Sequence, residues 1–428
     1  MSNPSLLEEK LNQIQYYPLN NGDEEINLES HREGTTTFFK TFFNGLNALS
    51  GVGLLSIPYA LSSGGWLSLI FFFIVAATTF FTGLLIRRCM DIDKKIRTYP
   101  DIGARAFGNI GRVGVTFLCY LELCLVATGF LILEGDNLHN LFSNMQFHYS
   151  WIHLSGKAGF VILVGLIILP SVWIRDLNKL SYVSTVGLLA CLVVIGAILW
   201  TGAFGGVGFH EKGRILNLTR IPTAFSLYTF CYSAHPIFPT LYTSMKDKSQ
   251  FNKVLFLCFF VCTTGYASMA ILGYMMYGEN VNSQVTLNLP VKQICSKIAI
   301  YTILIIPIAK YAIIVTPVAS SIENRFAHNK TYVMILIRTM LLISTVVVAV
   351  AVPFFGDLVS LVGSLLNASA SIILPCVCYL KMSRIYKRWS YELVIIIGIL
   401  LMGFSVVIFG TYTSATQLID HWHENNMR

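Results

Sequence analysis

A series of long apolar stretches without lysine or arginine constrains this chain more than any other feature. Leu67–Leu85 and Tyr391–Gly410 are two clear examples. Each is close to the about 20 residues that a helix needs to cross a hydrocarbon core of roughly 30 Å. A spanning segment must satisfy its backbone hydrogen bonds internally, so these stretches predict transmembrane helices.

The composition supports a membrane protein along the whole chain. Only 12% of the residues are charged and 54% are hydrophobic, whereas about 25% of the residues in soluble domains are charged. That is too little charge to cover a water-exposed globule. A hydrophobicity window of about 19 residues predicts eleven spans, at residues 38–62, 66–87, 113–134, 157–174, 181–202, 222–243, 254–277, 297–320, 331–352, 356–380 and 391–413.

The chain divides into one membrane domain and two short tails. Residues 1–34 are acidic and poor in aromatic residues, which predicts a disordered cytoplasmic tail. Residues 35–415 contain all eleven spans, and 416–428 form a short tail on the other side. The first apolar stretch follows a polar segment, so we expect no cleaved signal peptide.

Lysine and arginine predict the orientation. With a cytoplasmic N-terminus, 21 of the 30 basic residues lie on or beside the cytoplasmic side and seven lie opposite. This bias places the C-terminus in a lumen or outside the cell. It also explains the net charge of +8 as loop charge facing anionic lipid, so no nucleic-acid partner is expected. Asn217, in an N-x-T sequon on the non-cytoplasmic side, is the expected glycosylation site.

The cysteines and the known catalytic motifs argue against metal sites and enzymes. Nine of the 10 cysteines lie in or beside apolar spans, and no CxxC pair occurs. We therefore expect no disulfide framework, metal or cofactor. The sequence has no HExxH, no GxSxG and no pair of intramembrane aspartates. An enzyme is not expected.

Two spans contain residues that interrupt a helix. The first span has Ser50-Gly51-Val52-Gly53 followed by Pro58, and each glycine costs a helix about 1 kcal/mol against alanine. The sixth has Ser233-Ala234-His235-Pro236, where Pro236 removes a helical hydrogen bond. Irregular backbone at membrane depth survives only where it lines a protein cavity or water.

The two interrupted spans are five apart in the chain. This spacing is expected when two five-span repeats of inverted topology place their broken first helices face to face. The free N–H groups of the half-helices would then point at an anionic group such as a carboxylate. The alternative is that glycine and proline are simply more frequent in membrane helices.

Ionisable residues inside the spans each need a reason, because a charge at a helix centre costs about 2.5–3.5 kcal/mol. Glu122, Lys310 and His235 are the candidates for proton coupling. A packing role for His235 remains open. Arg338 is expected to snorkel or to form a structural pair. Glu134 and Asp136, near the outer end of the third span, are expected to be solvated.

Several segments resemble the amino acid/auxin permease family, above all its plant vacuolar amino acid transporters and their vesicular inhibitory amino acid relatives. The resemblance covers nearly all of residues 35–415. It rests on FFNGLNALSGVGLLSIPYAL (Phe42–Leu61), TYPDIGARAFG (Thr98–Gly108), ILEGDNL (Ile132–Leu138), Arg175-Asp176-Leu177, FCYSAHPIFPTLYTSMKD (Phe230–Asp247) and AKYAIIVTPVA (Ala309–Ala319).

The resemblance implies an all-α polytopic membrane protein with a LeuT-like five-plus-five inverted repeat and an eleventh transmembrane helix. It also implies proton-linked amino acid transport. In sodium-coupled relatives the eighth span helps to hold the ion, and here Lys310 occupies that neighbourhood. Lys310 would either release its proton during transport or act as a fixed cation, and both alternatives argue against sodium. Many relatives carry a glutamate where this chain has Gly129.

The sequence thus predicts a secondary active transporter of neutral amino acids, proton-coupled and sodium-independent. An amino-acid sensor with a transporter fold is the alternative. We expect a monomer in a vacuolar or other endomembrane, with the plasma membrane as a second location. The expected substrate contacts are Asn47, which could instead brace the break, and Ser50, Gly51, Val52, Gly53, Tyr232, Ser233, His235 and Tyr311.

Overall fold

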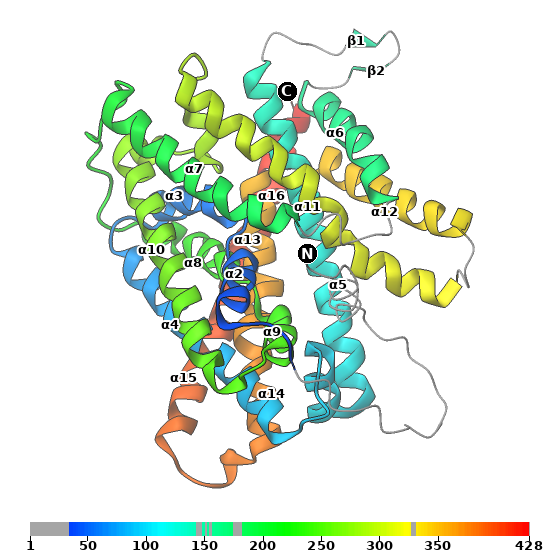
Figure 1. Cartoon of the computed structure of the whole chain (residues 1–428). Coiled ribbons are helices and arrows are strands. Elements are labelled where there is room, and N and C mark those ends of the chain that lie inside the picture. The colour runs from blue at the N-terminus through cyan, green and yellow to red at the C-terminus, as the bar shows by residue number, and fades with distance from the viewer. Residues whose placement is uncertain are drawn as a thin grey trace.

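Long helices packed side by side make up almost all of the structure (Figure 1). A computed structural model describes residues 34–142, 148–149, 152–153, 156–173, 182–326 and 331–427. In these ranges the only strands are β1 (His148–Tyr149) and β2 (Ile152–His153), which pair antiparallel. The tail predicted at residues 1–34 lies outside the described residues, except for Gly34. The expected all-α membrane fold is confirmed.

The first five spans are helical, and the first of them is split. They are α2 (Phe38–Leu49) with α3 (Gly53–Gly64), then α4 (Ser68–Ile92), α5 (Tyr99–Leu141), α6 (Gly156–Val172) and α7 (Tyr182–Phe204).

The next five spans repeat this pattern, because their first member is split as well. They are α8 (Ile221–Cys231) with the 3₁₀ turn η3 (His235–Ile237) and α9 (Phe238–Ser244), then α10 (Phe251–Tyr277), α11 (Ile294–Phe326), α12 (Thr331–Ala351), and α13 (Phe355–Leu361) continued by the π-helical segments η7 (Val362–Asn367) and η8 (Ser369–Ile373) and by α14 (Leu374–Ser383).

The eleventh span extends beyond its predicted end at residue 413. It consists of α15 (Tyr391–Ser405), the π-helical segment η10 (Val406–Gly410) and α16 (Thr411–Met427). Most of the tail predicted at residues 416–428 is therefore helical. Short 3₁₀ turns lie in the connections, namely η2 (Leu218–Arg220), η4 (Lys248–Gln250), η5 (Gly278–Asn280), η6 (Val285–Asn288) and η9 (Ile385–Lys387).

These helices account for the eleven predicted spans. Eight of the described helical segments are long and apolar enough to cross a membrane. The fourth span is the shorter apolar helix α6, and the first and sixth spans are each divided into two pieces.

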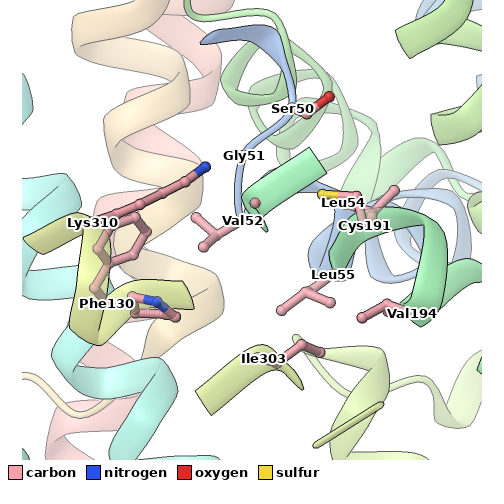
Figure 2. A pocket seen from close by; sticks show the side chains of 12 residues that line it. Ser50, Gly51, Val52, Leu54, Leu55, Phe130, Cys191, Val194, Ile303 and Lys310 are labelled. Carbon is pink, nitrogen blue, oxygen red and sulfur yellow. The ribbon is translucent and has the colours of Figure 1, made fainter. Parts of the chain in front are cut away.

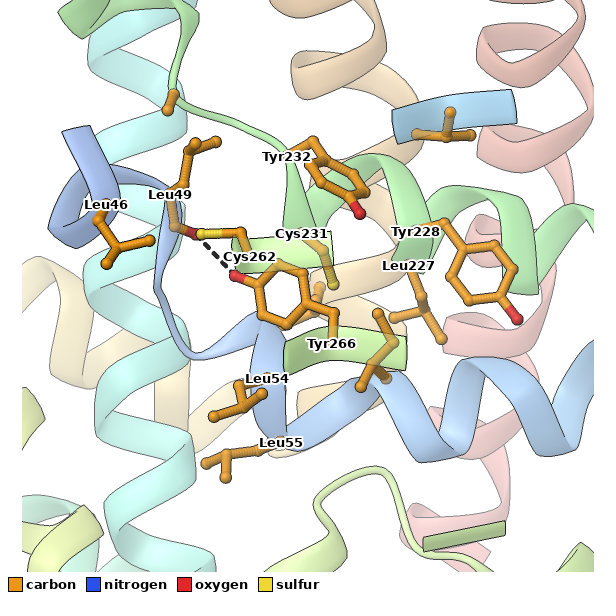
Figure 3. Packing of buried hydrophobic residues seen from close by; sticks show 14 of the residues in the cluster. Leu46, Leu49, Leu54, Leu55, Leu227, Tyr228, Cys231, Tyr232, Cys262 and Tyr266 are labelled. Carbon is orange, nitrogen blue, oxygen red and sulfur yellow. Dashed lines mark hydrogen bonds between the residues drawn. The ribbon is translucent and has the colours of Figure 1, made fainter. Parts of the chain in front are cut away.

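The helices of the two halves pack in two groups. α3 lies against α8, and α10 packs on both α2 and α3. In a second group, α5 packs on α6, α11 and α12. The broken spans thus lie beside each other, as expected for two five-span repeats. Leu46, Leu54, Cys231 and Tyr266 are among the buried residues where the broken spans meet α10 (Figure 3).

The helix of the third span begins well before the predicted start of that span at residue 113. α5 begins at Tyr99, because Thr98 and Asp101 form a capping box and Pro100 lies in the first helical turn. Gly108, with φ 67° and ψ −151°, then kinks the chain before it continues across the bilayer. A capping box therefore starts this helix well before the hydrophobic stretch.

Candidate functional site

The break in the first span leaves backbone groups without helical partners. α2 ends at Leu49 and α3 begins at Gly53. The hydroxyl of Tyr266, on α10, donates to the Leu49 carbonyl at 2.6 Å and accepts from the Gly51 N–H at 3.4 Å (Figure 3). An unsatisfied backbone group in hydrocarbon costs several kcal/mol. Tyr266 therefore stabilises the broken geometry.

The break in the sixth span, called the second break below, lies directly against the break in the first span, called the first break. α8 ends at Cys231, since Pro236 cannot donate a helical hydrogen bond. A Cβ atom at Gly53 would lie 2.9 Å from Sγ and 3.1 Å from Cα of Cys231. The Cys231 thiol donates to the Gly53 carbonyl at 3.5 Å. Contact between the breaks thus depends on the missing side chain at Gly53.

A small cavity of about 40 Å³ lies beside the first break (Figure 2). It is enclosed by the link between α2 and α3 and by α3, α5, α7 and α11. Its lining consists of Ser50, Gly51, Val52, Leu54, Leu55, Phe130, Gly187, Cys191, Val194, Ile303, Pro307 and Lys310. One water needs about 10–15 Å³ of such space. The cavity therefore has room for a few waters and is too small for an amino acid.

Lys310 is the only charged residue of this lining. Its Nζ donates to Oδ1 of Asn47, in the last turn of α2, at 3.5 Å. Across the described ranges, no carboxylate forms an ion pair with Lys310. The ammonium therefore lies beside the first break, in the neighbourhood that the sequence predicted.

Gly187, on α7, is a lining residue that the sequence reasoning missed. A Cβ atom there would lie 3.0 Å from Cε and 3.1 Å from Nζ of Lys310, and 3.3 Å from Oδ1 of Asn47. The glycine therefore makes room for the contact between Lys310 and Asn47. No local sequence signal marks Gly187, because its role depends on tertiary packing.

Gly129 does not line the cavity, although the next residue, Phe130, does. A Cβ atom at Gly129 would lie 3.9 Å from Leu358 and from Phe355 of α13. The Cβ atom of a side chain at this position would therefore face α13 and not the cavity.

Glu122 and Ser233 were predicted separately, and the structure brings them together. The Ser233 hydroxyl, in the break of the sixth span, donates to Oε1 of Glu122 on α5. Glu122 is 7% exposed, and its Oε2 has no hydrogen-bond partner among the described residues. A buried carboxyl group with a free oxygen therefore lies beside the second break.

His235 is fully buried outside the cavity lining. Its Nε2 lies 3.0 Å from the Thr79 carbonyl and 2.9 Å from the Thr82 hydroxyl, both on α4. The ring centroid is 4.9 Å from that of Phe238. These contacts join η3 to α4, so His235 braces the second break in this conformation.

The two tyrosines predicted as substrate contacts bond to neighbouring helices through their hydroxyl groups. The hydroxyl of Tyr232 pairs with Thr263 of α10 at 2.9 Å, and that of Tyr311 pairs with Thr345 of α12 at 2.5 Å. Neither tyrosine belongs to the cavity lining. Of the predicted substrate contacts, Ser50, Gly51 and Val52 line the cavity, and Asn47 and Gly53 adjoin it.

The other charged residues of the spans are buried and largely paired. Arg338 donates to Glu323 at 2.7 Å and to the Val172 carbonyl at 2.9 Å, the structural pairing that was one of its two expectations. The solvation predicted for Glu134 and Asp136 was wrong, as the two residues are 0% and 6% exposed.

Glu134 and Asp136 are buried because α5 continues past them and another segment packs over this part of the helix. α5 continues to Leu141, so both residues lie inside the helix and not at its end. Asp136 pairs with Lys157 at 2.8 Å and accepts from Gln284 at 3.1 Å. The segment that contains Gln284 therefore covers this part of α5.

Asn217 lies in the connection between α7 and α8, next to the end of α3. Its backbone N–H donates to the Gly64 carbonyl at 3.0 Å, and the residue is partly exposed. The Arg175-Asp176-Leu177 motif lies outside the described residues.

The family described as "Transmembrane amino acid transporter protein" matches residues 34–416. Amino acid transporter AVT1I of Arabidopsis thaliana is 52% identical over 401 residues, which cover 92% of this chain and 99% of that protein. Amino acid transporter AVT1J of the same plant is 54% identical over 405 residues, covering 94% and 96%. Among solved structures, a substrate-bound, outward-open Na⁺-coupled sialic acid symporter aligns over 96% of both chains, with 11% identity and a TM-score of 0.48.

The family match includes both broken spans and every residue of the cavity lining. The family is one of membrane transport proteins and not of enzymes. The chain therefore belongs to the transmembrane amino acid transporter family.

Proposed function

We propose that this protein carries neutral amino acids across a vacuolar or other endomembrane by alternating access, coupled to protons and independent of sodium. The observation that carries this proposal is the Lys310 ammonium beside the first break, 3.5 Å from Asn47. The carbonyl end of α2 faces this break, and a helix C-terminus favours a cation. Lys310 supplies a positive charge there without a bound metal ion.

The cavity lining supports a neutral substrate, since Lys310 is its only charged residue. A Cβ atom at Gly51 would meet no atom of the described residues within 4 Å, so a ligand can approach this backbone. The first N–H groups of α3 are the expected partners of a substrate carboxylate. When the cavity widens, Asn47, Ser50 and Gly53 join this contact, together with Ser233 from the other break.

Glu122 and His235 are the other proposed proton-coupling groups. Both lie next to the sixth-span break, through Ser233 for Glu122 and through the turn η3 for His235. A change in the spacing of the two breaks would alter the surroundings of both groups. The lysine and arginine distribution supports a cytoplasmic N-terminus, and the proposed transporting unit is a monomer.

Reconstitution of the purified protein into liposomes tests this proposal. With an imposed pH gradient and a panel of labelled amino acids, neutral amino acids should accumulate, and replacing sodium with choline should have no effect. Binding without accumulation would favour the sensor alternative. Sodium-dependent uptake without any pH effect would contradict the proposed coupling.

Two variants separate the roles of Lys310. Lys310→Ala should abolish gradient-driven accumulation, because it removes the charge beside the break. Lys310→Arg keeps the charge but does not release a proton. If Lys310 carries the proton, the arginine variant should lose concentrative transport almost as completely as the alanine variant. If Lys310 is a fixed cation, arginine should restore much of it.

A further inference from the structure

A second cavity, of about 470 Å³, opens where α4, α5, α14 and η9 meet, on the predicted cytoplasmic side. Its volume falls within the about 300–1,000 Å³ that is typical of small-molecule sites. Four of its eight lining residues are cationic and none is acidic. The lining consists of Ile92, Arg105, Ala106, Lys381, Met382, Arg384, Tyr386 and Lys387.

Most of this positive charge is not neutralised by the protein. Asp93 pairs with Arg105 at 2.7 Å. The Lys95 N–H and the Arg105 side chain both donate hydrogen bonds to the Asp93 carboxylate. These bonds hold the pKa of Asp93 below its usual value, so Asp93 stays charged. Lys381, Arg384 and Lys387 form no ion pair with any described residue. A hollow lined by one sign of charge focuses its field and attracts counter-ions.

The backbone at Arg384 is a second and independent observation. Arg384 has φ 56° and ψ 23°, and it is the only non-glycine residue of the described ranges with a positive φ. It follows the last turn of α14, where glycine or asparagine usually takes this conformation. A strained backbone at such a position points to a use for the side chain. Here that side chain lines the cavity.

The chain segments next to the cavity residues have the character of a membrane interface. Trp389 and Tyr391 follow the cavity segment, and each is 92% exposed. Exposed tryptophan and tyrosine residues gather at the level of lipid headgroups. Ile92 in the lining and Phe107 in the first turns of α5 are exposed apolar residues. Lipid chains can therefore contact the protein next to the cationic hollow.

We propose that this cavity binds the multiply phosphorylated headgroup of a phosphoinositide from the cytoplasmic leaflet. Several phosphate charges match the three unpaired cations, and basic pockets between transmembrane helices on this side suit such headgroups. The exposed aromatic and apolar residues of these neighbouring segments favour a lipid over a soluble inositol phosphate. α4 packs on α8, α9 and α10 and so belongs with the broken spans, whereas α5 packs on α6, α11 and α12. The ligand would join α4 to α5. It would therefore bias the relative movement of the two groups.

Binding to the purified full-length protein in phosphatidylcholine nanodiscs tests the lipid assignment. The probe is phosphatidylinositol 4,5-bisphosphate with a fluorescent acyl chain. Saturable binding is expected, with phosphatidylserine a poor competitor. Inositol 1,4,5-trisphosphate should compete at least about tenfold more weakly than the unlabelled lipid, because it lacks acyl chains whose buried CH₂ groups contribute about 0.8 kcal/mol each. Equal competition by the soluble trisphosphate would overturn the lipid assignment, and equal competition by phosphatidylserine would overturn the phosphoinositide headgroup.

Variants that remove positive charge inside and outside the cavity test the location. Arg384→Gly and Lys387→Gln should each weaken binding about fivefold. Arg384→Gly should melt no lower than the wild type, because glycine accepts the positive φ, so its loss of binding would not reflect misfolding. The control is the double variant Lys94→Gln, Lys95→Gln, which removes exposed charge from the same side outside the cavity. Control and cavity variants that lose affinity equally would refute the site.

Discussion

The contact between the two breaks makes a sharp prediction about two neighbouring glycines. In Gly53→Ala, the new methyl group would lie 2.9 Å from Sγ and 3.1 Å from Cα of Cys231. The backbone Cα cannot move without shifting α8. In Gly51→Ala, the methyl group would meet no atom of the described chain within 4 Å. Neither glycine has a positive φ, so neither replacement strains the backbone.

The expected changes in the free energy of unfolding have opposite signs at Gly53 and Gly51. Overpacking by a methyl group costs about 1–3 kcal/mol. Replacing glycine by alanine in a helix returns at most about 1 kcal/mol, which leaves a net loss of up to about 2 kcal/mol. Gly53→Ala should therefore destabilise the protein. Replacing an unconstrained glycine by alanine stabilises by about 0.4–1 kcal/mol through the unfolded chain. Gly51→Ala should therefore melt at or slightly above the wild-type temperature.

Thermal unfolding of the purified variants, followed by size-exclusion chromatography, measures this order. Adding Cys231→Ala to Gly53→Ala removes the Sγ contact and should recover part of the loss, while the contact with Cα remains. The coupling energy from the double-mutant cycle should be about 0.5–3 kcal/mol. The reasoning is refuted if Gly53→Ala melts like the wild type, or if Gly51→Ala is the less stable of the two.

Three further outcomes follow from the structure. Tyr266→Phe leaves two backbone groups of the first break without their partner and should lower the free energy of unfolding by about 1–3 kcal/mol, measured as a lower melting temperature. Tyr277→Phe, on the same helix, is the control, because the Tyr277 hydroxyl has no partner among the described residues. Arg338→Ala leaves Glu323 uncompensated and should cost about 3–5 kcal/mol, and replacing both residues by methionine should restore a monodisperse protein. Endoglycosidase should shift the electrophoretic mobility of the wild type but not of Asn217→Gln. An accessibility tag inserted in the loop that contains Asn217 would contradict the predicted orientation if it were labelled from the cytosol.

The sequence predicts the spans and their breaks because both depend on local properties. A span needs a sufficiently long apolar stretch, and the breaks need glycine or proline at fixed places. The neighbourhood of Lys310 and the first break was likewise predictable, although from the family resemblance and not from spacing alone. The contact of Glu122 with Ser233 was not predicted, because two separate spans have to meet before it exists.

The missed features depend on tertiary packing. Tyr266 supports the first break from α10, more than 200 residues away along the chain. Gly187 matters only because Lys310 passes beside it. Glu134 looked solvated because the hydrophobic stretch ends near it, but the helix continues and other segments cover it. Hydropathy describes a single segment and contains no information about what packs against it.

The cavity is too small for an amino acid, so contacts on one side must open before a substrate enters. On the predicted cytoplasmic side, Thr36 ties the start of α2 to the end of α9. Its N–H donates to the Ser244 carbonyl at 2.9 Å, and its own carbonyl accepts from the Lys246 N–H at 3.0 Å. The Thr36 hydroxyl adds a third bond to the Ser244 carbonyl at 2.6 Å.

On the opposite side, Gln284 ties the segment between α10 and α11 to α5. It accepts from Asn137 at 2.7 Å and donates to Asp136 at 3.1 Å. A hydrogen bond contributes a net of about 0.5–1.5 kcal/mol, so each set of contacts is worth a few kcal/mol at most. Conformations separated by a few kcal/mol exchange, and a ligand can shift their populations. The proposed alternating access requires one set to open while the other holds, so these two sets of contacts are where it should be tested.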